Sequence, residues 1–117
     1  MKEVLFVIRT NMYAKTKEAL AQKGFFAFTS KEVLGRGREN VQFEIEQGTE
    51  EKEIVQPTLV AKRLMIVWVC EEQIEELIST IIDVNQTNHT GDGKIFVSPV
   101  ADGIRIRTGE KGNDVVL

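Results

Sequence analysis

Apolar and polar positions divide the first part of the chain into a strand, a helix and a second strand. Residues 4–8 form a continuous apolar run rich in β-branched and aromatic residues, which is typical of a buried strand. Asn11 is placed to cap the helix that follows, because its side chain can accept a bond from an unpaired backbone N–H, and Gly24 ends that helix. A second strand is predicted at residues 25–34. The side chains expected to anchor it are Phe26, Phe28 and Val33.

The pattern of strands and helices resumes after an irregular segment. Residues 64–70 are apolar at every position and predict a third strand. Glu71 and Glu72 then favour the start of a helix, because acidic side chains interact well with the positive end of a helix dipole. Two short strands, at residues 94–97 and 103–107, close the chain. The apolar stripe of the second helix has the i, i+3, i+4, i+7 and i+8 spacing of an amphipathic helix and comprises Ile74, Leu77, Ile78, Ile81 and Ile82.

These elements follow the order β-α-β-β-α-β, which is the ferredoxin-like plan of the α+β class. Two helices can cover only one face of a four-stranded sheet, yet both faces are apolar here. In the first strand Phe6 points to one face, while Leu5 and Val7 point to the other, and the third strand alternates in the same way. The uncovered apolar face therefore needs a partner, and another copy of the chain is the economical one.

The periodicity changes between residues 35 and 60. This segment begins with Gly35-Arg36-Gly37-Arg38, which is flexible and basic, and continues into an acidic part. Apolar and polar residues alternate over 41–45, so a short strand is expected there. A connection of this length in a small domain is usually functional, and we interpret it as a recognition loop.

Composition limits the classes of protein to which the chain can belong. The 117 residues suffice for one domain, 1–117, and the 42% apolar and 28% charged content is that of a globular protein. No apolar run approaches the ~20 residues of a membrane span, and no signal peptide is expected at the N-terminus. A net charge of −3 argues against binding nucleic acid and against membrane insertion. The single cysteine, Cys70, cannot form an intrachain disulfide, so a cytoplasmic location is predicted.

Glycine and basic residues near the C-terminus form the strongest candidate site. Gly91-Asp92-Gly93-Lys94 makes a turn whose backbone can approach a ligand closely, because the two glycines lack a Cβ atom. Arg105 and Arg107 lie two apart in a predicted strand, so their side chains leave on one face. Backbone N–H groups, a lysine and two guanidinium groups suit a polyphosphate. The alternative is a hairpin with a polar edge.

Catalysis has little support. His89 is the only histidine and has no cysteine near it in the sequence, so a metal site is not indicated. Cys70 follows an apolar strand and is expected to pack there, while Ser98 lacks the sequence context of a nucleophile. The chain also lacks the Gly-x-x-x-x-Gly-Lys-Ser/Thr phosphate-binding loop. These observations favour binding over catalysis.

Several motifs together resemble the signature of the PII nitrogen-regulatory signal-transduction proteins. They are Thr-Gly-Asp-Gly-Lys-Ile-Phe-Val at 90–97, Ile-Arg-Ile-Arg-Thr-Gly-Glu at 104–110 and Gly-Arg-Gly-Arg at 35–38, together with Lys62. The resemblance covers essentially the whole chain, and the joint pattern is specific where each motif alone is weak. It implies a trimer with a T-loop at about 37–60, a B-loop at about 86–94 and a C-terminal tail at 108–117.

The resemblance also implies a nucleotide site between neighbouring subunits, with ATP or ADP as the effector. The residues that it implies are Thr29, Gly35, Gly37, Arg38, Trp68, Gly91, Asp92, Gly93, Lys94, Arg105 and Arg107. Lys62 would contact 2-oxoglutarate, and Glu39 would take part in a linked Mg²⁺ site. Glu39 stands where the family usually has a glutamine, so 2-oxoglutarate binding by this chain alone is expected to be weak.

The function implied by the resemblance is that of a nitrogen-regulatory signal transducer, not of an enzyme. Such a protein would bind adenine nucleotide with 2-oxoglutarate and control nitrogenase, glutamine synthetase or a transporter through its T-loop. The only tyrosine, Tyr13, lies in the first helix, so modification at a T-loop tyrosine cannot occur. The long acidic loop resembles the nitrogenase-associated branch, and the chain would form a homotrimer or a heteromer with a PII-like paralogue. The alternative is a small nucleotide-using enzyme with the same inter-subunit anion pocket.

Overall fold

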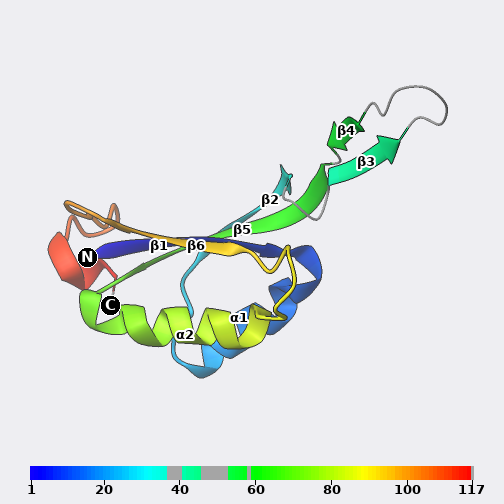
Figure 1. The fold of residues 1–117 in the computed structure, drawn as a ribbon. Helices are drawn as coiled ribbons and strands as arrows, with labels where there is room; N and C mark the ends of the chain where they lie inside the picture. Colours follow the sequence, from blue (N-terminus) through cyan, green and yellow to red (C-terminus); the bar gives the residue numbers. More distant parts are fainter. Residues whose placement is uncertain (37–40, 46–52, 58, 117) are drawn as a thin grey trace.

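The computed structural model describes residues 1–36, 41–45, 53–57 and 59–116. Its main layer is an antiparallel sheet of four strands in the order β2–β5–β1–β6, with two helices packed on one face (Figure 1). This arrangement confirms the predicted α+β, ferredoxin-like fold. The strands are β1 (Lys2–Arg9), β2 (Thr29–Gly35), β5 (Val60–Val69) and β6 (Lys94–Pro99), and the helices are α1 (Tyr13–Gln22) and α2 (Ile74–Asn85).

A second, smaller sheet stands apart from this layer. It consists of β3 (Val41–Ile45) and β4 (Glu53–Pro57), which pair antiparallel along their whole length. Figure 1 shows this hairpin extending from the end of the main sheet at which β2 ends and β5 begins. The strand expected at 41–45 is therefore confirmed, and the sequence pattern did not indicate its partner.

The core lies between the main sheet and the helices. In the central strands β1 and β5, the side chains that face the helices are buried, whereas the alternate side chains on the opposite face are more exposed. The helices close the core from the other side with Leu20, Leu77 and Ile81. Burial of each such large side chain stabilises the fold by about 1.5–3 kcal/mol. The buried apolar residues of the two strands are Val4, Phe6, Ile8, Met65, Val67 and Val69.

The opposite face of the main sheet is apolar, and both helices lie away from it (Figure 1). Leu5 stands opposite Ile66 on one neighbouring strand and opposite Phe96 on the other, so three strands share one apolar row. Trp68 is 43% exposed and Phe96 58% exposed on this face. The prediction that both faces of the sheet are apolar is confirmed.

The end of α1 agrees with the prediction from the sequence, but its start does not. At Gly24 (φ +88) the chain turns, and the N–H of Phe25 donates to the carbonyl of Leu20 (2.9 Å), so the predicted stop at Gly24 is confirmed. The predicted cap at Asn11 is wrong, because a 3₁₀ turn at Thr10–Met12 precedes α1 and no side chain caps either segment. Among the described residues, no helix is long and apolar enough to cross a membrane.

The second strand begins later than the sequence indicates. Residues 25–28 have no regular structure and lead from the end of α1 to Thr29, where β2 begins. The bond from Phe25 to the helix end is accompanied by burial of its ring, whereas Phe26 is 76% exposed. The expectation that Phe26 anchors the strand is therefore wrong, while Phe28 does pack against the core.

The strand expected at 103–107 is also wrong. The chain turns there instead, and the strand-like pairing in this stretch is an isolated bridge at Ile104. The N–H of Gly109 (φ +76) donates to the carbonyl of Arg105 (2.7 Å), which closes a tight loop. Arg105 and Arg107 therefore do not share the face of a strand.

Candidate functional site

The turn that joins α2 to β6 lies against the end of β1. Gly91 (φ +96) and Gly93 (φ +115) adopt backbone conformations that residues with side chains disfavour. A Cβ atom on Gly93 would lie 2.0 Å from the carbonyl oxygen of Val7, so only glycine lets the turn approach β1 this closely. Lys94 follows as the first residue of β6, opposite Val7. Part of the demand for glycine in this turn thus comes from packing against β1.

Asp92 holds the loop at residues 87–93 together. Its carboxylate accepts bonds from the N–H of Thr87 (2.7 Å), from the Thr87 hydroxyl and from the N–H of Asn88 (3.1 Å). It also forms an ion pair with Arg9 of β1 (Nη1–Oδ1 2.7 Å). The bonds from Thr87, followed by the bond from Arg9, hold the pKa of Asp92 well below its ordinary value. The carboxylate is therefore ionised at neutral pH, and its contribution to stability is lost only as the pH falls through that lowered pKa.

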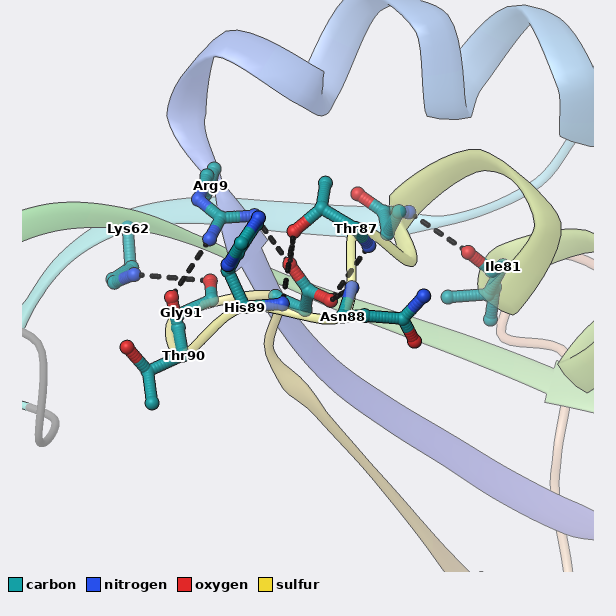
Figure 2. Close-up of polar contacts among 10 residues, drawn as sticks. Arg9, Lys62, Ile81, Thr87, Asn88, His89, Thr90 and Gly91 are labelled. Atoms are coloured by element: carbon teal, nitrogen blue, oxygen red, sulfur yellow. Dashed lines mark hydrogen bonds and ion pairs between the residues drawn. The ribbon is translucent and has the colours of Figure 1, made fainter.

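Two cations on neighbouring strands bind successive carbonyl groups of the same loop (Figure 2). Arg9 and Lys62 stand opposite each other in the pairing of β1 with β5. Nη2 of Arg9 donates to the carbonyl of Thr90 (2.9 Å), and Nζ of Lys62 donates to the carbonyl of Gly91 (3.4 Å). Sequence reasoning named Lys62 but missed Arg9, whose only signal is a charge directly after a buried strand.

An open groove of about 600 Å³ runs beside this loop. Its cationic side chains come from Arg36, Lys62 and Lys94, and the acidic residue that lines it, Asp92, is paired with Arg9. An anion in the groove would therefore experience a favourable local potential despite the negative net charge of the chain. The groove brings together six of the residues implied by the resemblance, which are Gly35, Lys62, Gly91, Asp92, Gly93 and Lys94.

A second group of the implied residues lies elsewhere on the molecule. Trp68 and Arg105 line a cavity of about 630 Å³, while Thr29 at the start of β2 and Arg107 are exposed. The indole N–H of Trp68 donates to the carboxylate of Glu3 (3.1 Å), which stands opposite it near the start of β1. Trp68 and Arg105, which share this cavity, are therefore at the end of the sheet away from Arg9, whereas Thr29 stands opposite Ile66 nearer the middle.

The two groups are well separated within one chain. Glu3, opposite Trp68, marks one of them on β1. Val7 and Arg9, opposite Lys94 and Lys62 of the groove, mark the other, and these steps of four to six residues span about 13–20 Å at ~3.3 Å per residue. Arg105 is also engaged by its own loop, through an ion pair with Glu110 (2.8 Å) and a bond to the carbonyl of Asp114 (3.2 Å). A single chain therefore does not bring the arginines to the groove.

Three of the implied residues, Gly37, Arg38 and Glu39, lie outside the described part of the chain. Glu39 is the residue expected to take part in a metal site. Within the ranges that the structure describes, no group of three or more His, Cys, Asp and Glu side chains is placed to hold a metal ion.

The fold and the groove together define a ferredoxin-like domain with a glycine-rich turn beside a cationic groove. The family model described as nitrogen regulatory protein P-II matches residues 1–110. The chain belongs to the nitrogen regulatory protein P-II family. The family predicted from the sequence is thereby confirmed. Proteins of this family are signal transducers rather than enzymes, which confirms the prediction that the chain is not an enzyme.

Similar proteins support this assignment over the whole chain. A protein of Methanosarcina barkeri named "Nitrogen fixation nifHD1 region GlnB-like protein 2" is 42% identical over 124 residues and covers 96% of each chain. A protein of Methanobacterium ivanovii named "Nitrogen fixation nifHD region GlnB-like protein 2" is 38% identical over 122 residues, with both chains fully covered. Among solved structures, "Structure of B. subtilis GlnK" matches with a TM-score of 0.77 and 26% identity, covering 97% of this chain and 96% of that one.

Proposed function

We propose that the chain is a signal transducer that binds ATP or ADP in a site shared by two copies of the chain. The observation that supports the site is the groove beside β1, where the Gly-Asp-Gly turn is flanked by Arg36, Lys62 and Lys94. Exposed backbone and three cations suit the phosphate groups of a nucleotide. Gly37 and Arg38 would add to this half of the site from the root of the long loop.

The other half of the site comes from a neighbouring copy. Arg105 and Arg107 would bind phosphate oxygens, while Thr29 and the backbone near Trp68 would face the base or the ribose. Because Trp68 and Arg105 lie about 13–20 Å from the groove along β1, one copy supplies the turn and the next supplies the arginines. A cyclic trimer, in which the open apolar sheet faces meet, provides such pairs.

The segment at about 37–60, which includes the β3–β4 hairpin, is the proposed contact with a target protein. It leaves the main sheet at Gly35 and returns at Val60, close to Lys62 of the groove. A ligand in the groove would therefore bias the arrangement of the hairpin and its docking on the target.

Nitrogenase is the favoured target, because the relatives are named for nitrogen-fixation regions. Glutamine synthetase and a transporter are the other proposed targets, and the protein would act in the cytoplasm as a homotrimer or with a paralogue.

The ligand 2-oxoglutarate is the second proposed effector. Lys62 would bind one of its carboxylates, and Glu39 would share a Mg²⁺ ion with the nucleotide, since this ion prefers hard oxygen ligands. A carboxylate at position 39 also repels an effector that carries two carboxylates, by about 1 kcal/mol in water at ~4 Å and about 4 kcal/mol at an effective dielectric of ~20. Calorimetric titration with Mg-ATP present should show weak 2-oxoglutarate binding that improves in Glu39→Gln. Tight binding of 2-oxoglutarate by the unmodified chain that is lost in Glu39→Gln would show that the carboxylate favours this effector, the opposite of the proposed effect.

The experiment that tests the nucleotide site is calorimetric titration of ATP into two single variants. Lys94→Ala and Arg107→Ala should each weaken binding by about 1.5–3 kcal/mol, the range for a hydrogen bond to a charged group. Both side chains are exposed, so the fold should survive. Lys15→Ala on α1 removes an exposed charge that lines neither the groove nor the cavity of Trp68 and Arg105 and serves as the control. Unchanged affinity in either variant would place the phosphate site elsewhere.

Mixing the two variants tests whether the site lies between copies. In a cyclic trimer that contains both, one interface joins a copy that retains Lys94 to a copy that retains Arg107, so one site is restored. Co-refolded mixtures should therefore recover high-affinity binding that neither variant shows alone. Absence of recovery in a verified mixed trimer would show that both residues act from one chain.

A further inference from the structure

We propose that Arg9 is a positioning residue that sets the phosphate-binding turn, an inference that rests on the nucleotide site proposed above. Arg9 extends from the end of β1 and reaches two groups of the loop with two different nitrogens. Nη1 binds the Asp92 carboxylate at 2.7 Å, and Nη2 binds the carbonyl of Thr90 at 2.9 Å (Figure 2). The ion pair is partly buried, with 25% and 22% of the two side chains exposed.

The first effect of Arg9 is on the orientation of the backbone. A trans peptide unit points its carbonyl and the following N–H in opposite directions. Because the carbonyl of Thr90 is turned toward Arg9, the N–H of Gly91 lies on the side away from Arg9. Thr90, Gly91 and Asp92 line the groove, whereas Arg9 does not. Arg9 therefore holds a carbonyl dipole out of the path of a phosphate group.

The second effect of Arg9 is on charge. Asp92 lies within the proposed phosphate turn and is ionised, because its pKa is held low by the loop and by Arg9. An unpaired carboxylate at this position would repel a polyphosphate. The guanidinium at 2.7 Å offsets that charge without entering the groove. Loss of Arg9 should therefore both loosen the turn and expose the ligand to the charge of Asp92.

The test is a double-mutant cycle with ATP affinity as the readout. Arg9→Met should weaken ATP binding by about tenfold or more, the equivalent of one charge-assisted hydrogen bond. In an Asp92→Asn background, the same substitution should weaken binding by only about threefold, because the charge that Arg9 offsets is already gone and only the bond to the Thr90 carbonyl remains to be lost. Arg9→Lys should give an intermediate loss, since one ammonium group cannot reproduce both directed bonds of a guanidinium.

Lys15→Met provides the control, because Lys15 is an exposed cation on α1 that lines neither the groove nor the cavity of Trp68 and Arg105. It should leave ATP affinity unchanged. Equal losses from Arg9→Met in both backgrounds would show that Arg9 does not act through the charge of Asp92, and this would overturn the positioning role as proposed. Unchanged affinity in folded Arg9→Met would overturn it as well.

Thermal unfolding establishes that each variant is folded before titration. If Arg9→Met does not fold, Arg9→Lys measured with and without Asp92→Asn completes the same cycle. Failure of the inference is also distinguishable from failure of the proposed function. Absence of ATP binding by the unmodified protein would disprove the nucleotide site itself. Normal ATP binding, together with additive effects of Arg9→Met and Asp92→Asn, would disprove only the role of Arg9.

Discussion

Gly93 meets two independent constraints at one position. Its φ of +115° is disfavoured for residues with a side chain, and the space that a Cβ would occupy is taken by the backbone of β1 at 2.0 Å. Gly24 meets only the first constraint, because its φ is +88° but nothing lies within 4 Å of the point that a Cβ would occupy. Comparison of Gly24 with Gly93 therefore separates the cost of backbone strain from the cost of a steric collision.

Replacement of these glycines by alanine should give different losses of stability. Gly24→Ala should cost about 1–2 kcal/mol, the strain of a left-handed conformation at a residue with a side chain. Gly93→Ala should cost more, because the turn must also move away from β1, and it should weaken ATP binding as well. Urea unfolding at equal protein concentration measures both, since assembly contributes to stability. A loss in Gly93→Ala no larger than that in Gly24→Ala would contradict the close approach.

The same residues show what the sequence could predict about the site. The Gly-Asp-Gly-Lys turn is contiguous in the chain, so its shape and its suitability for an anion follow from residue type alone. Arg9 acts on a loop more than 80 residues away, and only the pairing of β1 with β5 and β6 brings it there. The anchoring role of Asp92 was hidden for the same reason, because its partners become clear only once the loop is folded.

At the scale of elements, local pattern predicted strands well where neighbouring strands were available to pair with them. β1, β5 and β6 were found because each carries a continuous apolar run and pairs in register with a neighbouring strand. Residues 103–107 alternate between apolar and basic side chains, yet Arg105 bonds within its own loop and no ladder forms. Alternation therefore shows that a segment could form a strand, but a ladder also requires an available edge.

The hairpin β3–β4 should be the least protected part of the described sheets. An isolated pair of strands is only marginally stable in water, whereas β1 and β5 are central strands of a four-stranded sheet over a buried core. Amide exchange should therefore be much faster at 41–45 and 53–57 than in β1, and binding of the target should slow it. The amides of β1 provide the internal control. Equal protection of hairpin and core without a target would argue against a recognition role.

At the scale of the whole molecule, one surface is unlike the rest. The sheet face away from the helices carries Leu5 and Ile66 at its centre, with Trp68 and Phe96 substantially exposed around them. An apolar surface that spans three strands is typical of an interface. The proposed nucleotide site has the same requirement, since its two halves stand about 13–20 Å apart on one copy. Apolar burial and ligand binding thus both point to assembly through neighbouring copies.

Sedimentation of the purified chain should therefore give a trimer, or a mixed trimer when a paralogue is present. Ile66→Lys places a charge at the centre of the open face and should dissociate the assembly, because an unpaired charge is costly to bury. ATP affinity should fall with it, since the site would lose its second half. Ala21→Lys adds the same charge at an exposed position of α1 and should change neither property. A stable monomer of the unmodified chain at micromolar concentration would remove both the trimer and the shared site.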